Sequence, residues 1–324
     1  MTNNPRILTV GTGAIGAIYS WRLSKTCDIT AVCRSNYDAV KNNGLNIESA
    51  KFGNEVFKPT EVVRKPEEAV SEDKPFDYIL VTLKALPEVY NVADIIAPAV
   101  SKNTAIVLIQ NGLGVEEPIV ERFPDNPIIS IVAYIGTSQT EPGTIKMVGR
   151  ESLLTGPYLG SKVDSEKERD AFIGYLREGG VDVNVVEDVE RIRWQKLFWN
   201  ASFSPVCTLT GLNTSEVLRN EDAMATAKHV MSEVIQASNA YGHGFDLEEQ
   251  MHAMISRTEA TATNYKPSMQ LDYERGNPME IEVILGVPMK KAQAKGVSVP
   301  HLETVYHVCS AANARIINKG KSSL

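Results

Sequence analysis

A glycine-rich turn near residue 11 constrains the fold of this chain more than any other feature. It stands between a short apolar run, Ile7 to Val10, and a helical pattern that ends at Leu23, and it reads Gly11-Thr12-Gly13-Ala14-Ile15-Gly16. Glycines at these spacings permit a tight turn, a close approach of the backbone to a pyrophosphate, and close packing of the helix on the strand. The motif alone could be a structural turn, but its place between a strand and a helix predicts a dinucleotide-binding site.

The chain from Arg6 to about Val186 alternates short apolar runs with helical patterns, which is typical of a parallel sheet covered by helices. The expected strands are Ile7 to Val10, Ile29 to Cys33, Tyr78 to Leu83, Ala105 to Ile109, Ile128 to Tyr134, Gly143 to Val148 and Val181 to Val185. The expected helices are Ala14 to Leu23, Tyr37 to Asn42, Pro87 to Val100 and Val115 to Arg122. Leu45 to Val63 alternates apolar and polar residues, and we expect it to be an antiparallel excursion.

After Asp188 the pattern becomes wholly helical. The expected helices are Val189 to Phe203, Glu221 to Tyr241, Leu247 to Thr263, Met279 to Lys295, which Pro288 should kink, and Pro300 to Ile317. The fold class is therefore α/β, with an N-terminal Rossmann dinucleotide-binding domain plus a C-terminal all-α domain. We place the dinucleotide-binding domain at residues 1–188 and the helical domain at residues 189–324.

Composition excludes several other classes of protein. A net charge of -7 argues against nucleic-acid binding, because such proteins need a basic surface. The four cysteines have no metal-ligand spacing, so we expect no metal site and a reducing compartment. The polar start leaves no room for a secretory signal, and no apolar stretch reaches the roughly 18 residues of a membrane helix. A cytoplasmic protein without membrane contact is expected.

Polar residues follow several of the expected strands. Arg34 stands after the second strand, where an acidic residue would read the ribose of NAD; an arginine there favours the 2′-phosphate of NADP. The alternative is a surface arginine. Lys84 and Gln110-Asn111-Gly112 follow later strands, where the nicotinamide half of the cofactor should lie. A solvated lysine and an Asn-Gly turn are the alternatives.

The first expected helix of the second domain carries Lys196 and Asn200, four residues apart and thus on one face, with Ser204 a further turn on. The pattern alone also fits an ordinary amphipathic helix whose lysine reaches solvent.

Taken together and in order, these residues resemble ketopantoate reductase over nearly the whole chain. The matching set is Gly11-x-Gly13-Ala14-Ile15-Gly16, Arg34, Lys84, Gln110-Asn111-Gly112, Trp194-x-Lys196-Leu197-x-x-Asn200, Ser268-Met269-x-x-Asp272 and Glu280-Ile281-x-x-x-x-Gly286. The resemblance implies an NADPH-dependent reductase of 2-dehydropantoate (ketopantoate) in pantothenate and coenzyme A synthesis. A small-molecule 2-oxo acid is the expected partner, and a homodimer is possible.

The resemblance also implies roles for single residues. Lys196 matches the catalytic lysine and Glu280 a substrate-binding acid at the catalytic centre. Hydride addition to a ketone leaves an alkoxide, which an ammonium can stabilise and then protonate. Asn111 and Asn200 match asparagines that contact nicotinamide and substrate. Ser268 matches a serine of the substrate carboxylate region, and Lys84 matches a lysine that lines the ligand cleft. Without the resemblance, Glu280 would be a helix N-terminal charge and Ser268 a helix cap.

One departure from the family pattern concerns the substrate. Ser204, followed by Pro205, stands where the family has a second asparagine, and Asn213 aligns only loosely with another. A serine is shorter than an asparagine and offers one donor, so a contact to substrate is lost or bridged by water. The alternatives are a paralogous NADPH-dependent reductase of another 2-oxo acid, ketone or imine, and a non-catalytic NADP-binding redox sensor.

Overall fold

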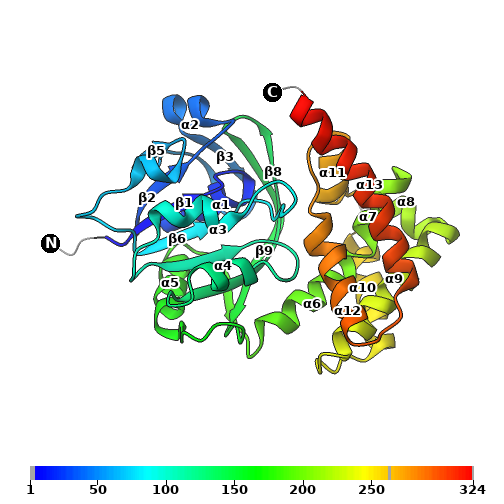
Figure 1. Ribbon diagram of the computed structural model, residues 1–324. Helices are drawn as coiled ribbons and strands as arrows, with labels where there is room; N and C mark the ends of the chain where they lie inside the picture. The colour runs from blue at the N-terminus through cyan, green and yellow to red at the C-terminus, as the bar shows by residue number, and fades with distance from the viewer. Residues whose placement is uncertain (1–3, 262–263, 323–324) are drawn as a thin grey trace. The chain divides into compact units, whose positions relative to one another are not determined.

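The computed structural model describes residues 4–261 and 264–322 of the chain (Figure 1). The chain divides into two compact units, and each is built from separate stretches. The first unit holds the residues up to Lys84 together with Asn91–Gln110 and Val115–Val189. The second unit holds Ala85–Tyr90, Asn111–Gly114 and the chain from Glu190 onward. Two short segments that follow strands of the first unit thus belong to the second.

The first unit is organised around one sheet, which has 10 strands in the described part of the chain. The strand order is β4-β3-β9-β8-β7-β6-β1-β2-β5, and β10 pairs with β9. The strands are β1 (Arg6–Val10), β2 (Asp28–Val32), β3 (Leu45–Ser49), β4 (Gly53–Phe57), β5 (Glu61–Val63), β6 (Tyr78–Val81), β7 (Ala105–Ile109), β8 (Ile128–Glu141), β9 (Thr144–Gly156) and β10 (Val183–Val185). All neighbours from β5 to β8 along this order are parallel. The strand order reverses between β1 and β6, and ligands of open α/β sheets bind at such a switch point.

Helices join the parallel strands of the first unit. They are α1 (Ala14–Leu23), α2 (Tyr37–Asn43), η1 (Pro66–Ala69), α3 (Val92–Ile96), η2 (Ala97–Ala99), α4 (Glu117–Arg122) and α5 (Glu166–Glu178). Helix α1 packs against α5, and α3 packs against α4. Strands β6 and β7 are buried along their whole length, which explains their continuous apolar sequences.

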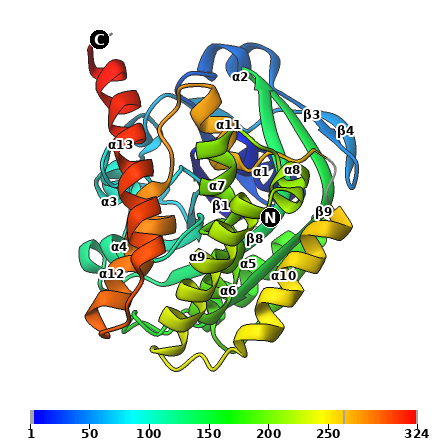
Figure 2. The ribbon, with the colours of Figure 1, turned by 90° about the vertical axis from the view of Figure 1, so that its right-hand side faces the viewer.

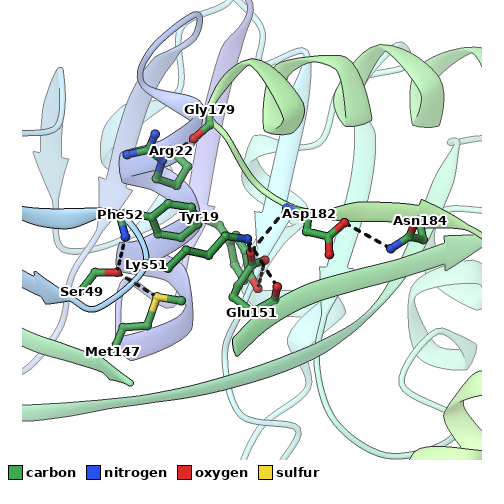
Figure 3. Close-up of polar contacts among 10 residues, drawn as sticks. All are labelled: Tyr19, Arg22, Ser49, Lys51, Phe52, Met147, Glu151, Gly179, Asp182 and Asn184. Carbon is green, nitrogen blue, oxygen red and sulfur yellow. Dashed lines mark hydrogen bonds and ion pairs between the residues drawn. The ribbon is translucent and has the colours of Figure 1, made fainter. Parts of the chain in front are cut away.

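A buried carboxylate ties together several elements of the first unit (Figure 3). Glu151 of β9 accepts hydrogen bonds from Lys51 Nζ at 2.7 Å, from the Tyr19 hydroxyl at 3.2 Å and from the Asp182 amide at 3.4 Å. A buried charge is tolerated only when it is paired in this way. Burial and the nearby Glu151 raise the pKa of Tyr19 well above its ordinary value. The cluster fastens the β3–β4 hairpin to α1 and to the sheet.

The second unit is helical and is centred on α9 (Glu221–Asn239) (Figure 2). The side chains of Val230, Met231 and Val234 on α9 are fully buried. Helices α7, α8, α10, α12 and α13 pack against it. The remaining bounds are α6 (Val189–Asn200), α7 (Phe203–Thr210), α8 (Thr214–Arg219), α10 (Leu247–Thr261), α11 (Ser268–Glu274), the π-helix η3 (Glu282–Gly286), α12 (Val287–Ala294) and α13 (Pro300–Ser322). None of the helices in the described part of the chain has the length and apolar character needed to cross a membrane.

The expected fold class is confirmed, but several expected elements of the first unit were wrong. The stretch Leu45 to Val63 is antiparallel only in β3 and β4, because β5 returns to the sheet edge and pairs in parallel with β2. The helix expected over Pro87 to Val100 is reduced to α3 and η2. Its start is set by Asn91, whose side chain accepts from the Ala93 amide at 2.9 Å. Helix α5 was not predicted, and β8 and β9 are much longer than expected.

The helical part also departs from expectation at its breaks. The helix expected over Val189 to Phe203 ends at Asn200, and the one expected over Met279 to Lys295 divides into η3 and α12. Helix α13 continues past Ile317 to Ser322, and the short helices α7, α8 and α11 were not expected. The predicted end of the helix that starts at Leu247, at residues 262–263, lies outside the described residues.

Candidate active site

The glycine turn of the first unit has the shape of a dinucleotide site. Gly11 has φ 104°, and a Cβ there would lie 2.5 Å from the Leu83 amide nitrogen. A Cβ on Gly16 would lie 2.5 Å from the Gly11 carbonyl oxygen, so both positions exclude a side chain. A Cβ on Gly13 would meet no atom nearer than the Gly11 oxygen at 4.0 Å. Packing therefore explains the outer two glycines, while the middle one leaves its backbone open to a pyrophosphate, and the site fits such a group.

The turn is braced by Thr12, one of the expected cofactor residues, and by two polar side chains that were not predicted, Thr82 and Asn36. The Thr82 hydroxyl, one residue past β6, donates to the Gly11 carbonyl at 2.7 Å. Thr12 Oγ1 donates to the Val32 carbonyl at 3.0 Å, and Asn36 Nδ2 donates to the Thr12 carbonyl at 2.8 Å. The end of β2 and the turn that follows it are thus fixed to the glycine turn. Ala14 and Ile15, the other residues expected here, form the first turn of α1.

The other expected cofactor residues of the first unit lie past the ends of parallel strands. Arg34 follows β2 by two residues and is exposed, and Lys84 follows β6 by three residues and is also exposed. Gln110 directly follows β7, is buried, and donates from Nε2 to the Leu83 carbonyl at 2.7 Å. Since β1, β2, β6 and β7 are parallel, these residues share the carboxyl edge with the glycine turn.

Three of the expected site residues meet in the second unit. Lys196 Nζ, from α6, donates to Asn111 Oδ1 at 2.7 Å. Asn111 Nδ2 donates to Glu280 Oε2 at 3.1 Å. The other carboxylate oxygen of Glu280, Oε1, accepts from the Ala85 amide at 3.0 Å. An ammonium, an amide and a buried carboxylate therefore form one hydrogen-bonded row, here called the Lys196 cluster.

The segment that carries Asn111 is held on the helices by its own backbone. The Gly112 carbonyl accepts from Arg193 Nη1 at 3.1 Å, and the Leu113 amide donates to the Val283 carbonyl at 2.9 Å. Gly112 has φ 95°, and a Cβ there would lie 2.5 Å from Val283 Cβ. Only glycine fits this backbone conformation at so close an approach.

The π-helix η3 explains why the Val283 carbonyl accepts a bond from outside its helix. In a π-helix a carbonyl pairs with the amide five residues on, and that residue here is Pro288, which has no N–H. The carbonyl of Val283 therefore accepts a hydrogen bond from the Leu113 amide instead. Pro288, expected to kink a long helix, lies in the first turn of α12, directly after the π segment.

The surroundings of Lys196 change the pKa of its side chain. Desolvation and, after it, the positive charge of Arg193 lower the pKa of Lys196, the Glu280 carboxylate raises it, and the net result is a pKa of about 8. Arg193 was not predicted as a site residue and is only 3% exposed. Its spacing could have identified it, because a residue three positions before Lys196 shares its helix face. A lysine with this pKa is mostly protonated at neutral pH and still gives up a proton readily.

The hydrogen bonds that define the Lys196 cluster do not include the side chains of Asn200, Ser204 or Ser268. Asn200 is half-buried one turn after Lys196, and Ser268 is exposed at the start of α11, where Pro267 rather than Ser268 occupies the cap position.

Ser204 does not lie on the helix of Lys196, contrary to expectation. It belongs to α7, which is separate from α6. At the end of α6 the Ser202 hydroxyl donates to the Phe198 carbonyl at 2.6 Å, so this carbonyl bonds to a side chain. Pro205 also cannot supply the amide that a continuous helix would need. The described residues contain no group of three or more His, Cys, Asp or Glu side chains able to hold a metal ion.

Comparisons with known proteins identify the family of the chain. The chain matches the family model described as ketopantoate reductase PanE/ApbA over residues 7–160 and the model of its C-terminal part over residues 188–313. An uncharacterized protein of Saccharomyces cerevisiae is 32% identical, with 96% of this chain and 94% of the relative covered.

Two solved structures share the fold. A crystal structure of 2-dehydropantoate 2-reductase from Methylococcus capsulatus has a TM-score of 0.84 and 34% identity, covering 96% of this chain and 97% of that chain. D-mandelate dehydrogenase with NADH and anilino(oxo)acetate has a TM-score of 0.84 at 19% identity, covering 96% of this chain and 99% of that chain, and shows likeness of fold alone. The chain therefore belongs to the ketopantoate reductase (PanE/ApbA) family, whose members are NADP-dependent oxidoreductases acting on CH–OH groups.

Proposed function

We propose that this protein reduces the keto group of 2-dehydropantoate to give pantoate, a step of pantothenate and coenzyme A synthesis. NADPH supplies the hydride when it is bound. The observation that carries the proposal is the Lys196 cluster, in which a lysine with a pKa of about 8 is held by Asn111 beside the buried Glu280. Reduction of a ketone requires from the protein a positive charge and a proton donor, and a lysine supplies both.

In the proposed reaction Lys196 handles the charge that develops on oxygen. The ammonium stabilises the alkoxide that forms at the former keto carbon and then transfers a proton to it, so that the product is a neutral alcohol. The lysine left neutral regains its proton from solvent. Asn111 holds the ammonium in place by accepting its hydrogen bond at 2.7 Å.

Glu280 is proposed to bind the distal hydroxyl of the substrate. Hydrogen bonds from the Ala85 amide and from Asn111 Nδ2 fix the carboxylate, and a carboxylate oxygen is an acceptor for a substrate hydroxyl. Asn200 and Ser268 are proposed as further substrate contacts, on the family pattern.

The cofactor is proposed to bind at the glycine turn, residues 11–16. Arg34 takes the 2′-phosphate, because its guanidinium can form a bidentate pair with it. Lys84 and Asn111 are proposed to contact the nicotinamide half. The open backbone at Gly13 supports the placement of the pyrophosphate.

A pair of lysine variants tests the proposed function. Lys196→Ala should lower kcat for ketopantoate reduction by roughly 10³- to 10⁵-fold, because it removes both the charge and the proton donor. NADPH binding, followed by its fluorescence, should persist. Lys228→Ala, which removes an exposed lysine from α9, is the matched control and should leave kcat unchanged. Full activity of Lys196→Ala, or wild-type protein that binds NADPH but turns over no 2-oxo acid, would refute the assignment.

A second candidate is the reduction of another 2-oxo acid, ketone or imine by the same cluster. Ser204 favours it, because this serine stands where the family has an asparagine and is buried at 4% exposure in α7. Comparing kcat/KM for ketopantoate with that for 2-oxo acids lacking the distal hydroxyl decides between the two. A preference for a substrate without that hydroxyl would select the second candidate.

We also propose a reducing compartment such as the cytoplasm for this protein. All four cysteines are free thiols and all are buried. Proteins of oxidising compartments instead use cysteines in disulfides.

A further inference from the structure

Arg64 directly follows β5, the edge strand that lies beside β2. The two strands are parallel, with Val32 opposite Val63, and the Cys33 amide donates to the Val63 carbonyl at 2.9 Å. Arg34 and Arg64 therefore leave neighbouring strands at the same edge of the sheet. This is the edge on which the glycine turn lies.

The first turn of α2 holds the Arg64 side chain in a fixed orientation. Its Cζ lies 3.9 Å from the centroid of the Tyr37 ring, and its Nη2 lies 2.8 Å from Asp38 Oδ1. The Tyr37 amide in turn donates to the Arg34 carbonyl at 3.2 Å. Tyr37 therefore links Arg64, which stacks on its ring, to the turn that carries Arg34. The Arg64 side chain remains 51% exposed. A guanidinium stacked on one face still presents donors at its edge to a ligand.

This position matches the adenosine end of a dinucleotide. In Rossmann domains the ribose is read just past the second strand, and an arginine there accommodates a 2′-phosphate. Asp38 would repel such a phosphate by its like charge, and Arg64 compensates that charge at 2.8 Å. Two arginines thus follow neighbouring strands at this edge of the sheet, and one of them, Arg64, neutralises the nearby acid.

We propose that Arg64 joins Arg34 in binding the 2′-phosphate of the cofactor and that it determines selectivity for NADP over NAD. Tyr37 and Asp38 are the residues that position Arg64. The inference rests on the cofactor part of the proposed function and is independent of the substrate.

Nucleotide fragments test this role without any turnover. Binding of 2′,5′-ADP and of 5′-AMP is measured by titration calorimetry on the wild type, Arg64→Ala, Arg64→Lys and Arg122→Ala. Arg64→Ala should weaken 2′,5′-ADP about 10- to 100-fold, the scale of a charge-assisted hydrogen bond, and change 5′-AMP by less than about twofold. Arg64→Lys should lie between, because it keeps the charge and loses the planar fork. Arg122→Ala removes an exposed arginine at the end of α4 and should bind both nucleotides as the wild type does.

The outcomes separate the inference from the assignments on which it rests. If the wild type prefers 2′,5′-ADP and Arg64→Ala keeps the full preference, Arg64 serves only to pair with Asp38, and the inference is overturned while the cofactor stands. If the wild type does not distinguish the two nucleotides, the inference and the proposed cofactor are overturned together. A wrong substrate shows itself differently, as absent ketopantoate turnover beside intact nucleotide selectivity.

Discussion

At the scale of single residues, Asn111 has an amide whose two ends cannot be exchanged. Its oxygen accepts from the Lys196 ammonium, and its nitrogen donates to the Glu280 carboxylate. Turning the amide over would place a donor against an ammonium and an acceptor against a carboxylate, and both contacts are repulsive. The residue therefore acts as an oriented link that forms a hydrogen bond with each of the two charged groups.

The cysteines allow a prediction at the same scale. Burial raises the pKa of Cys27 and Cys33 to about 11 and of Cys207 and Cys309 to about 12. Since the thiolate is the reactive form, the native protein should show almost no reaction with a thiol reagent at pH 8. Four thiols should react after denaturation, matching the four cysteines of the chain. Rapid labelling of the native state would contradict the described packing.

At the scale of elements, the segment Asn111–Gly114 contacts η3 so closely that no side chain fits at Gly112. Gly112→Ala should destabilise the protein by roughly 3 kcal/mol, because alanine is strained at φ 95° and its Cβ would meet Val283. Gly296→Ala is the matched control, with φ 71° and no atom within 4 Å, and should cost roughly 1 kcal/mol. Urea denaturation measures both values. Equal losses would show that the close approach to Val283 contributes nothing.

The same elements show what the sequence can and cannot predict. Helix α1 and strand β7 match their predicted ranges, because periodicity and apolar runs are local signals. The break after Asn200 and the π-helix before Pro288 were not predicted. The break after Asn200 is accompanied by a local hydrogen bond from the Ser202 hydroxyl to the Phe198 carbonyl, which apolar periodicity does not reveal. The carbonyl of Val283 in the π-helix accepts from the Leu113 amide, and this bond forms only once distant segments of the chain meet.

At the scale of the whole molecule, the second unit is not one continuous stretch of chain. Glu280 accepts from the Ala85 amide and the Asn111 side chain, and Val283 accepts from the Leu113 amide. A chain of residues 190–324 alone lacks these partners and leaves a buried carboxylate unsatisfied, which is costly. We expect that fragment to melt without a sharp transition by circular dichroism. A cooperative transition close to that of the complete chain would contradict this interdependence.

The candidate site depends on the same long-range assembly. The family pattern predicted Lys196, Asn111 and Glu280, and the hydrogen bonds among them join residues that lie up to 169 positions apart in the sequence. Arg193 and the Ala85 amide were not named, since an arginine on a helix usually reaches solvent and a backbone amide leaves no mark in sequence. Spacing along one helix is readable from sequence, but contacts between separate segments require the folded chain.

The central claim is that Lys196 donates the proton and that its neighbours set the pH at which it does so. The measurement is the pH dependence of kcat/KM for reduction, which reports the unliganded protein. Because the protonated lysine is the active form, kcat/KM should be level below pH 8 and fall above it, following a pKa of about 8. Removing the carboxylate in Glu280→Gln should move this midpoint to lower pH, and removing the cation in Arg193→Gln should move it to higher pH. A midpoint near the ordinary lysine value of 10.5, or a shift of both variants in one direction, would contradict the account.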